Sequence, residues 1–179
     1  MPVTGTERVL LVKGSTAELP AGGHRVLPDG LPEQFTPFGN RIKILGYGNP
    51  AGEFMRPGWD PHNPWDGDEA RERARRYWRI GQDRVLGWLE APSTAPRYLL
   101  LAIPDRREGT VIRYAWQIDV TGEWEYYLTD VGDFDGWGVP LGERDHEHRL
   151  LGRSLRENRD GKIVQVLQNY AHGWRVIDV

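Results

Sequence analysis

The stretch that decides the fold covers residues 66–118, and it opens with Asp66-Gly67-Asp68-Glu69-Ala70-Arg71-Glu72-Arg73-Ala74-Arg75-Arg76-Tyr77-Trp78-Arg79. Asp66 is a favourable helix N-cap, and Glu69 stands three residues later, as in a capping box. Ala70, Ala74 and Trp78 recur at helical spacing and would share one side of a helix. We therefore predict one prominent, arginine-rich helix over 66–79.

Acidic residues precede arginines by four positions twice in this predicted helix. Glu69 with Arg73 and Glu72 with Arg76 are pairs in the favourable order, each worth roughly 0.2–0.5 kcal/mol. A separate stripe of arginines is left only partly neutralised, and it consists of Arg71, Arg75 and Arg79.

Two apolar runs follow the helix, over 97–103 and 110–118. A turn-like segment over 104–109 joins them, so they predict a β-hairpin with a six-residue connection. The apolar run over 85–89 fits either an extension of the helical region or the start of a strand.

Further strands are predicted from short apolar or alternating runs elsewhere. The continuous apolar run at 9–12 predicts a central strand over 7–12 that is buried on both faces. The other predicted strands cover 41–47, 123–128, 163–168 and 174–177, and 130–137 reads as an acidic loop. Residues 19–63 are rich in proline and glycine and predict a loop-rich insert. This insert either helps to form a binding site or an interface, or it has no role in binding.

Length and composition limit the class of protein. A chain of 179 residues with 39% hydrophobic and 27% charged residues fits one folded α+β domain over 1–179. The absence of cysteine excludes disulfides and thiolate metal sites. No apolar run approaches the roughly 20 residues of a membrane span, so we expect a soluble, cytoplasmic protein with no membrane partner. The net charge of −3 argues against a large phosphate-tracking groove.

Several segments carry a resemblance to known families. Tyr77-Trp78-Arg79-Ile80, the runs over 97–103 and 109–118, and the closing segment 149–155 together resemble a small bacterial domain associated with GIY-YIG nuclease chains. The element order is also similar to the PUA-like β-barrels, including the EVE and ASCH groups, and Trp65-Asp66-Gly67 before an arginine-rich helix resembles the EVE start. The resemblance implies a small mixed, mainly antiparallel β-barrel that binds nucleic acid, often through a modified base in a concave aromatic pocket. A GIY-YIG motif is absent from the sequence, so a cutting function is not implied.

Arginines and tryptophans are the candidate binding residues. A guanidinium matches phosphate oxygens in a bidentate manner, and a base stacked on an aromatic ring gains roughly 1–3 kcal/mol. The alternatives are a salt-bridged helix face for the arginines, or helix C-terminal stabilisation for Arg79, and a place in the core for most of the eight tryptophans. The predicted nucleic-acid-binding residues are Arg71, Arg75, Arg76, Arg79, Trp59, Trp65, Trp78 and Trp137.

Metal and catalytic motifs are weak in this sequence. Loose oxygen-ligand spacing occurs at Asp130, Asp133 and Asp135, but it fails the EF-hand pattern and favours an acidic turn. His146 and His148 lie two apart and would need a third ligand, such as His172 or His24, so a polar loop or strand is the better interpretation. Neither Ser15 nor Ser154 lies in a nucleophile elbow, and no phosphate-binding glycine motif is present.

The sequence therefore predicts a binding module for DNA or RNA, with no cofactor and no metal. Two alternatives stay open. One is a metal-assisted hydrolase or nuclease that uses the aspartates or histidines named above, and the other is a protein-interaction domain that uses residues 19–63. The sequence does not fix the oligomeric state.

Overall fold

The computed structural model shows an α+β protein and describes residues 6–14, 22–24, 42–46, 54–56, 67–105, 107, 109–128, 133–166 and 173–179. The chain divides into two compact units. Unit 1 comprises Met1–Thr16, Ala95–Ile118 and Leu141–Val179, and unit 2 comprises Ala17–Thr94 and Asp119–Pro140. That the whole chain folds as a single domain stays a prediction.

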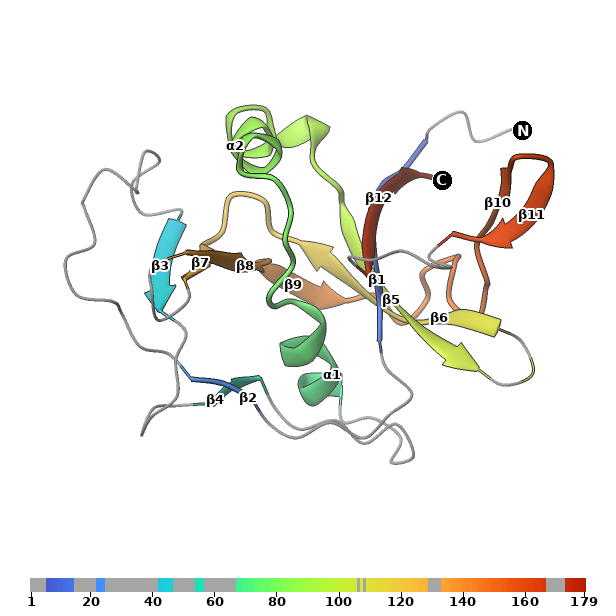
Figure 1. Cartoon of the computed structure of the whole chain (residues 1–179), viewed down its shortest axis with the longest axis horizontal. Coiled ribbons are helices and arrows are strands. Elements are labelled where there is room, and N and C mark those ends of the chain that lie inside the picture. The colour runs from blue at the N-terminus through green and yellow to red at the C-terminus, as the bar shows by residue number, and fades with distance from the viewer. Residues whose placement is uncertain are drawn as a thin grey trace. The chain divides into compact units, whose positions relative to one another are not determined.

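A five-stranded sheet forms unit 1, in the order β12-β1-β5-β6-β9 (Figure 1). The strands are β1 (Arg8–Lys13), β5 (Tyr98–Asp105), β6 (Gly109–Ile118), β9 (Leu141–Arg144) and β12 (Trp174–Asp178). All neighbouring pairs are antiparallel except β1 with β5, which is parallel. The prediction of a central first strand is confirmed, because Val9, Leu10 and Val12 are all completely buried.

The predicted hairpin of β5 and β6 is confirmed, but its connection is shorter than expected. Pairing continues to Asp105 opposite Gly109, which leaves three residues between the strands instead of six. Gly109 has a φ of 81°, a left-handed conformation that glycine adopts without steric cost. The backbone can therefore turn early.

Apolar side chains cover both faces of this sheet. One face joins Val9, Leu11, Leu100 and Ile112 to Leu150 and Val166. On the other face, Tyr114 and Trp116 are stacked with ring centroids 5.3 Å apart, and the Arg144 guanidinium carbon lies 4.5 Å from the Tyr114 ring centre. Burial on two faces explains why these strands read as continuous apolar runs.

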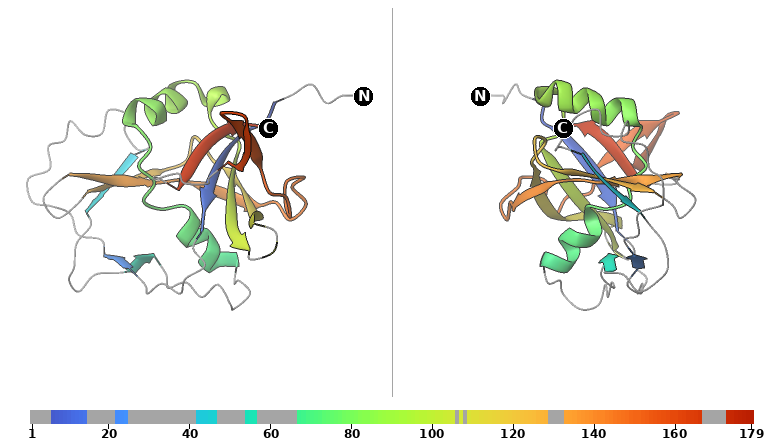
Figure 2. Two further views of the ribbon diagram at one scale, coloured as in Figure 1. Left: turned by 45° about the vertical axis from the view of Figure 1, so that its right-hand side comes forward. Right: turned by 90° about the vertical axis from the view of Figure 1, so that its left-hand side faces the viewer.

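A separate hairpin completes unit 1, formed by β10 (Arg156–Arg159) and β11 (Lys162–Gln165) (Figure 2). Asp160 and Gly161 link its strands with φ values of 50° and 80°, the positive pair that a type I′ turn requires. The strand predicted over 163–168 is confirmed as far as Gln165. Strands β9 and β10 were not predicted, since their residues are largely polar.

Unit 2 contains a three-stranded sheet in the order β3-β7-β8. Strand β3 (Ile42–Gly46) is parallel to β7 (Trp124–Leu128), which is antiparallel to β8 (Phe134–Gly138). The predictions for 41–47 and 123–128 are confirmed. The acidic-loop prediction for 130–137 is wrong from Phe134 onward, because this segment pairs with β7. A small pair, β2 (Gly22–His24) with β4 (Phe54–Arg56), lies within the predicted insert.

Helices in unit 2 are shorter than the sequence predicted. Helix α1 spans Gly67–Ala74 and does not continue to Arg79. Tyr77 adopts a φ of 68°, and Trp78 then forms a β-bridge with Trp137, which removes these residues from a helical path. The run over 85–89 belongs to a second helix, α2 (Gln82–Glu90), followed by a 3-10 turn, η3 (Pro92–Thr94).

The described strands of each unit form open sheets, and no closed barrel is found among them. In the five-stranded sheet, β12 and β9 are the outer strands and do not pair with each other. Of the helices in the described ranges, none is long and apolar enough to span a membrane.

Candidate functional site

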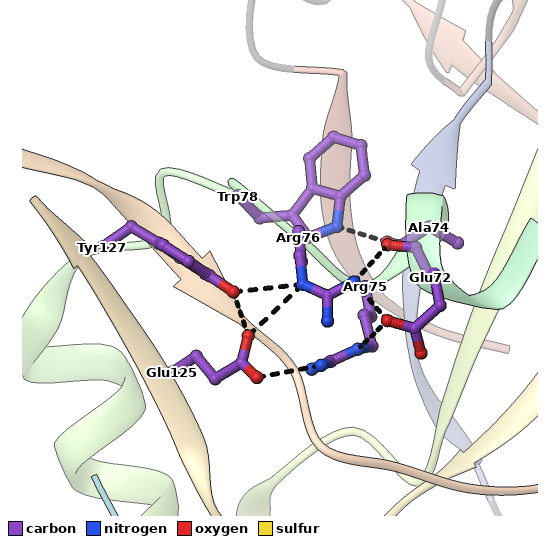
Figure 3. Close-up of polar contacts among 7 residues, drawn as sticks. All are labelled: Glu72, Ala74, Arg75, Arg76, Trp78, Glu125 and Tyr127. Carbon is purple, nitrogen blue, oxygen red and sulfur yellow. Dashed lines mark hydrogen bonds and ion pairs between the residues drawn. The ribbon is translucent and has the colours of Figure 1, made fainter. Parts of the chain in front are cut away.

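A buried cluster of charged side chains lies in unit 2, where the chain leaves α1 and runs beside β7 (Figure 3). Arg75 directs one amino group to Glu125, with Nη2 2.9 Å from Oε1, and its Nε lies 3.3 Å from Oε2 of Glu72. The Arg75 side chain is only 14% exposed and that of Glu125 only 13%. Two acidic residues from different elements therefore hold this arginine.

Arg76 is held more tightly still, with 5% of the residue exposed. Its Nε donates to the Tyr127 hydroxyl at 3.1 Å and lies 3.4 Å from Oε2 of Glu125. Its Nη1 donates to the backbone oxygen of Glu72 at 3.0 Å and also to the Glu72 carboxylate. The Tyr127 hydroxyl in turn donates to Glu125, as the dashed lines in Figure 3 show.

The backbone turn after α1 sets this geometry. Trp78 exchanges two backbone hydrogen bonds with Trp137, at 3.1 and 2.8 Å, and the Val139 N–H donates to the Arg75 carbonyl at 2.7 Å. Gly136 has a φ of 120°, and a Cβ there would lie 2.6 Å from the Tyr77 carbonyl carbon. Only glycine permits so close an approach, so β8 can anchor the turn that places Arg75 and Arg76.

The charges of the cluster balance, with two arginines against two glutamates. Burial alone raises the pKa of Glu125, but Arg75, the Tyr127 hydroxyl and Arg76 outweigh it, so the pKa lies below its usual value. Burial and the Glu125 charge raise the pKa of Tyr127. Burial alone lowers the pKa of Arg76, but its interactions with Tyr127, Glu125 and Glu72 outweigh burial, so the pKa lies above its usual value. At neutral pH Glu125 is therefore ionised and Tyr127 is a neutral donor.

This arrangement is suited to structural cohesion more than to ligand binding. The guanidinium groups that would face a phosphate instead face carboxylates, and the cluster has no net charge to attract an anion. Arg75 and Arg76, two of the predicted phosphate contacts, are thus brought together, but as a buried salt-bridged pair. This is closer to the alternative of a salt-bridged helix face. The predicted Glu72 to Arg76 pair is confirmed.

The other two predicted arginines lie apart from this cluster. Arg79 has a side chain 63% exposed and pairs with Asp135 at 3.1 Å, so it stays accessible. Arg71 is half-buried on α1 and has an interaction of its own. Phosphate binding by these residues stays a prediction.

Trp78 and Trp137 lie in the core of unit 2. Trp78 is 8% and Trp137 1% exposed, and their indole N–H groups donate to the carbonyls of Ala74 and Ile80. Trp137 packs in edge-to-face contacts with neighbouring aromatic rings, namely Trp124, Tyr126 and Phe134. Both rings are covered by protein in this structure, and contact of these two tryptophans with a base stays a prediction. Trp59 and Trp65 lie outside the described residues.

The candidate metal ligands among the described residues do not assemble. Asp133 is exposed, and Asp135 pairs with Arg79. His146 is exposed, whereas His148 is buried and its Nε2 lies 2.9 Å from Glu7 Oε1. The described residues contain no group of three potential ligands that could hold a metal ion. Asp130, His172 and the side chain of His24 lie outside the description.

The histidine contact has a clear internal role in unit 1. His148 Nδ1 accepts the Leu150 backbone N–H at 3.2 Å, so the hydrogen of the neutral ring is on Nε2 and is donated to Glu7. The Tyr98 ring meets the imidazole edge-on at 4.6 Å. This contact ties the 145–150 turn to the start of β1.

Sequence reasoning missed Glu125 and Tyr127 as partners of the arginines. The available signal was the alternation in β7, where Glu125 and Tyr127 share one face of the strand. A carboxylate beside a tyrosine on a half-buried face requires a cationic partner.

Comparison with known proteins found no matching family model, no matching curated protein and no matching solved structure.

Formal charge is distributed unevenly between the units. Unit 1 carries 13 basic and 9 acidic residues, which gives +4, and unit 2 carries 10 basic and 17 acidic residues, which gives −7. Together they make the net charge of −3 for the chain. Unit 1 is therefore basic although the net charge of the whole chain is negative.

Proposed function

We propose that this protein is a nucleic-acid-binding module and that unit 1 supplies the phosphate contacts. The observation that carries the proposal is the formal charge of +4 on unit 1 within a chain of net charge −3. A compact basic unit attracts a phosphate backbone at short range, even where the net charge of the chain is negative.

The position of the contact differs from the one that the sequence indicated. Arg75 and Arg76 give their donors to Glu72, Glu125 and Tyr127, so they add little to a phosphate surface. Arg79 contributes from unit 2 only at the cost of its pair with Asp135. The cations of unit 1 are better placed to act as the electrostatic footprint.

Two finer proposals accompany this one. A PUA-like relationship is supported by the order of a helical region followed by the β5 and β6 hairpin, whereas the open sheets of the described residues do not support it. Recognition of a modified base rests on Trp59 and Trp65, because Trp78 and Trp137 are buried.

The test is fluorescence anisotropy with labelled DNA and RNA oligonucleotides, with and without modified cytosine and adenine, at two salt concentrations. Binding that weakens as salt rises is the expected result, because phosphate contacts release counterions. Polyglutamate of similar charge serves as the control polyanion. Failure of every oligonucleotide to bind at low salt, or equal competition by polyglutamate, would refute the proposed function.

A further inference from the structure

Four of the seven exposed basic residues described in unit 1 lie in residues 149–162, the segment that leads into and begins the β10 and β11 hairpin. This segment contains five basic residues against two acidic ones, a formal charge of +3, and they are Arg149, Arg153, Arg156, Arg159 and Lys162 against Glu157 and Asp160. Four of the cations are exposed, namely Arg149, Arg153, Arg156 and Lys162. Most of the positive excess of unit 1 thus lies in one stretch of chain.

Internal ion pairs account for only part of this charge. Glu157 binds Arg159, with Oε1 2.8 Å from Nε and 2.6 Å from Nη2, and it also binds Arg175 of β12. Within the described residues, the side chains of the four exposed cations make no hydrogen bond or ion pair. They are therefore available to an external anion.

The hairpin is a short, defined ribbon. Its backbone pairs run from Arg156 opposite Gln165 at the base to Arg159 opposite Lys162 at the tip, about 10 Å at roughly 3.3 Å per residue. Gln165 Oε1 accepts the Thr110 N–H at 3.1 Å, and Glu157 holds Arg175, so the base is anchored to β6 and β12. The ribbon is visible in orange-red beside β12 in Figure 1.

An exposed apolar side chain follows Lys162 in the sequence of the hairpin. Ile163 is 66% exposed. It is the one large hydrophobic residue in the described part of the chain that is exposed to solvent. It lies on β11 opposite Asn158, which is also exposed. Apolar contact with a thymine methyl group and polar contact with a base edge are the two kinds of contact that a ribbon makes in a groove.

We propose that the β10 and β11 hairpin enters the major groove of duplex DNA, with Arg153, Arg156 and Lys162 on phosphates and Ile163 towards the base edges. This inference rests on the proposed nucleic-acid-binding function and adds the surface and the type of nucleic acid. The major groove of B-form DNA admits a two-stranded ribbon, whereas that of A-form RNA is deep and narrow. Duplex DNA is accordingly the partner that fits.

The experiment measures anisotropy of labelled duplex DNA, duplex RNA and single-stranded DNA of one sequence with the full chain. The test variant combines Arg153→Gln, Arg156→Gln and Lys162→Gln, and the charge-matched control combines Lys43→Gln, Arg73→Gln and Arg84→Gln in unit 2. The test variant should lose at least about tenfold in affinity at 0.1 M salt, and the slope of log K against log salt should fall by about 3. The control should change little, because all three of its substitutions lie outside the hairpin.

A fourth variant, Ile163→Asn, keeps the charge and should weaken binding to duplex DNA without changing the salt slope. Circular dichroism and a thermal transition like those of wild type establish that each variant is folded, and single substitutions replace any combination that is not. Unchanged binding by the test variant while wild type binds would refute the hairpin contact and leave the proposed function intact. Equal affinity for duplex RNA would refute the groove assignment, and no binding by wild type would refute the proposed function itself.

Discussion

Replacing Glu125 with glutamine tests whether the buried charge cluster stabilises unit 2. Glu125 is 2.9 Å from Arg75, 3.4 Å from Arg76 and accepts the Tyr127 hydroxyl, while its side chain is 13% exposed. Removal of one partner from a buried ion pair costs about 3–5 kcal/mol. Glu72 remains as a partner for both arginines, so we expect the lower end, about 3 kcal/mol of unfolding free energy.

Urea unfolding followed by tryptophan fluorescence measures this loss, since Trp124 and Trp137 are buried close to the cluster in the same unit. For a chain of this size, a loss of about 3 kcal/mol corresponds to a fall in Tm of roughly 6–12 °C. Glu123→Gln is the matched control. Glu123 lies two residues earlier, is 54% exposed and is 3.8 Å from Lys43, so its replacement should cost less than about 0.5 kcal/mol.

A double-mutant cycle of Glu125→Gln with Tyr127→Phe then measures the coupling of the two side chains. Because the hydroxyl donates directly to the carboxylate, the two losses should be non-additive by about 0.5–3 kcal/mol. If Glu125→Gln unfolds within about 0.5 kcal/mol of wild type, the cluster does not stabilise unit 2 and our account of its role is wrong.

Three further perturbations follow from the same structure. The stability advantage of wild type over Glu125→Gln should be full above the ordinary pKa of 4.5 and disappear as pH falls through the lowered pKa of the folded protein, as urea unfolding across pH 2–7 would show. Gly136→Ala should destabilise by about 2–3 kcal/mol in thermal unfolding, because its Cβ would meet the Tyr77 backbone at 2.6 Å. His148→Ala should cost about 1–3 kcal/mol by leaving Glu7 without its donor.

Two of these perturbations have a matched control variant, and the third has an outcome that would refute it. Gly87→Ala in α2 meets no atom within 4 Å and should be neutral or stabilising by about 0.5–1 kcal/mol, so equal destabilisation at both glycines would refute the steric argument. His146→Ala, at an exposed position, should be nearly silent. A wild-type advantage that persisted to pH 2 would show that ionised Glu125 is not its source.

Strands buried on two faces could be predicted from the sequence because their signal is local. Val9 and Leu10 in β1, and Leu99 and Leu100 in β5, are neighbours that point to opposite faces and are all completely buried, so successive positions along these strands must be apolar. The same reasoning found β6, β7 and β12. Where successive strand positions all face protein, a continuous run of apolar residues is enough to predict the strand.

Strand β8 was not predictable by that reasoning. Its sequence includes Asp135, Gly136 and Gly138, which have low intrinsic strand propensity. The glycines are required because a Cβ at Gly136 would strike Tyr77 and one at Gly138 would lie 2.6 Å from Glu125. Tyr77 and Glu125 are distant from these glycines in the sequence, so no local pattern predicts the contacts.

The end of α1 was mispredicted for the same reason. Helical periodicity continues through Trp78, yet the bridge to Trp137 and the positive φ of Tyr77 override it. For the candidate site, the pair of Glu72 with Arg76 was visible because it is four residues apart. The contribution of Glu125 could not be predicted from the sequence, because it depends on a contact between residues 50 positions apart.

The placement of β1 has a consequence for biosynthesis. Its backbone pairs on one side with β5 and on the other with β12, at separations of about 90 and 170 residues. During translation, this strand, whose four central residues are apolar, leaves the ribosome before β5 and β12, and it gains its second neighbour only after residues 174–178 have been made. Until then its unpaired edge can bind chaperones or other nascent chains. Loss of β12 should therefore lower the yield of native protein as well as its stability.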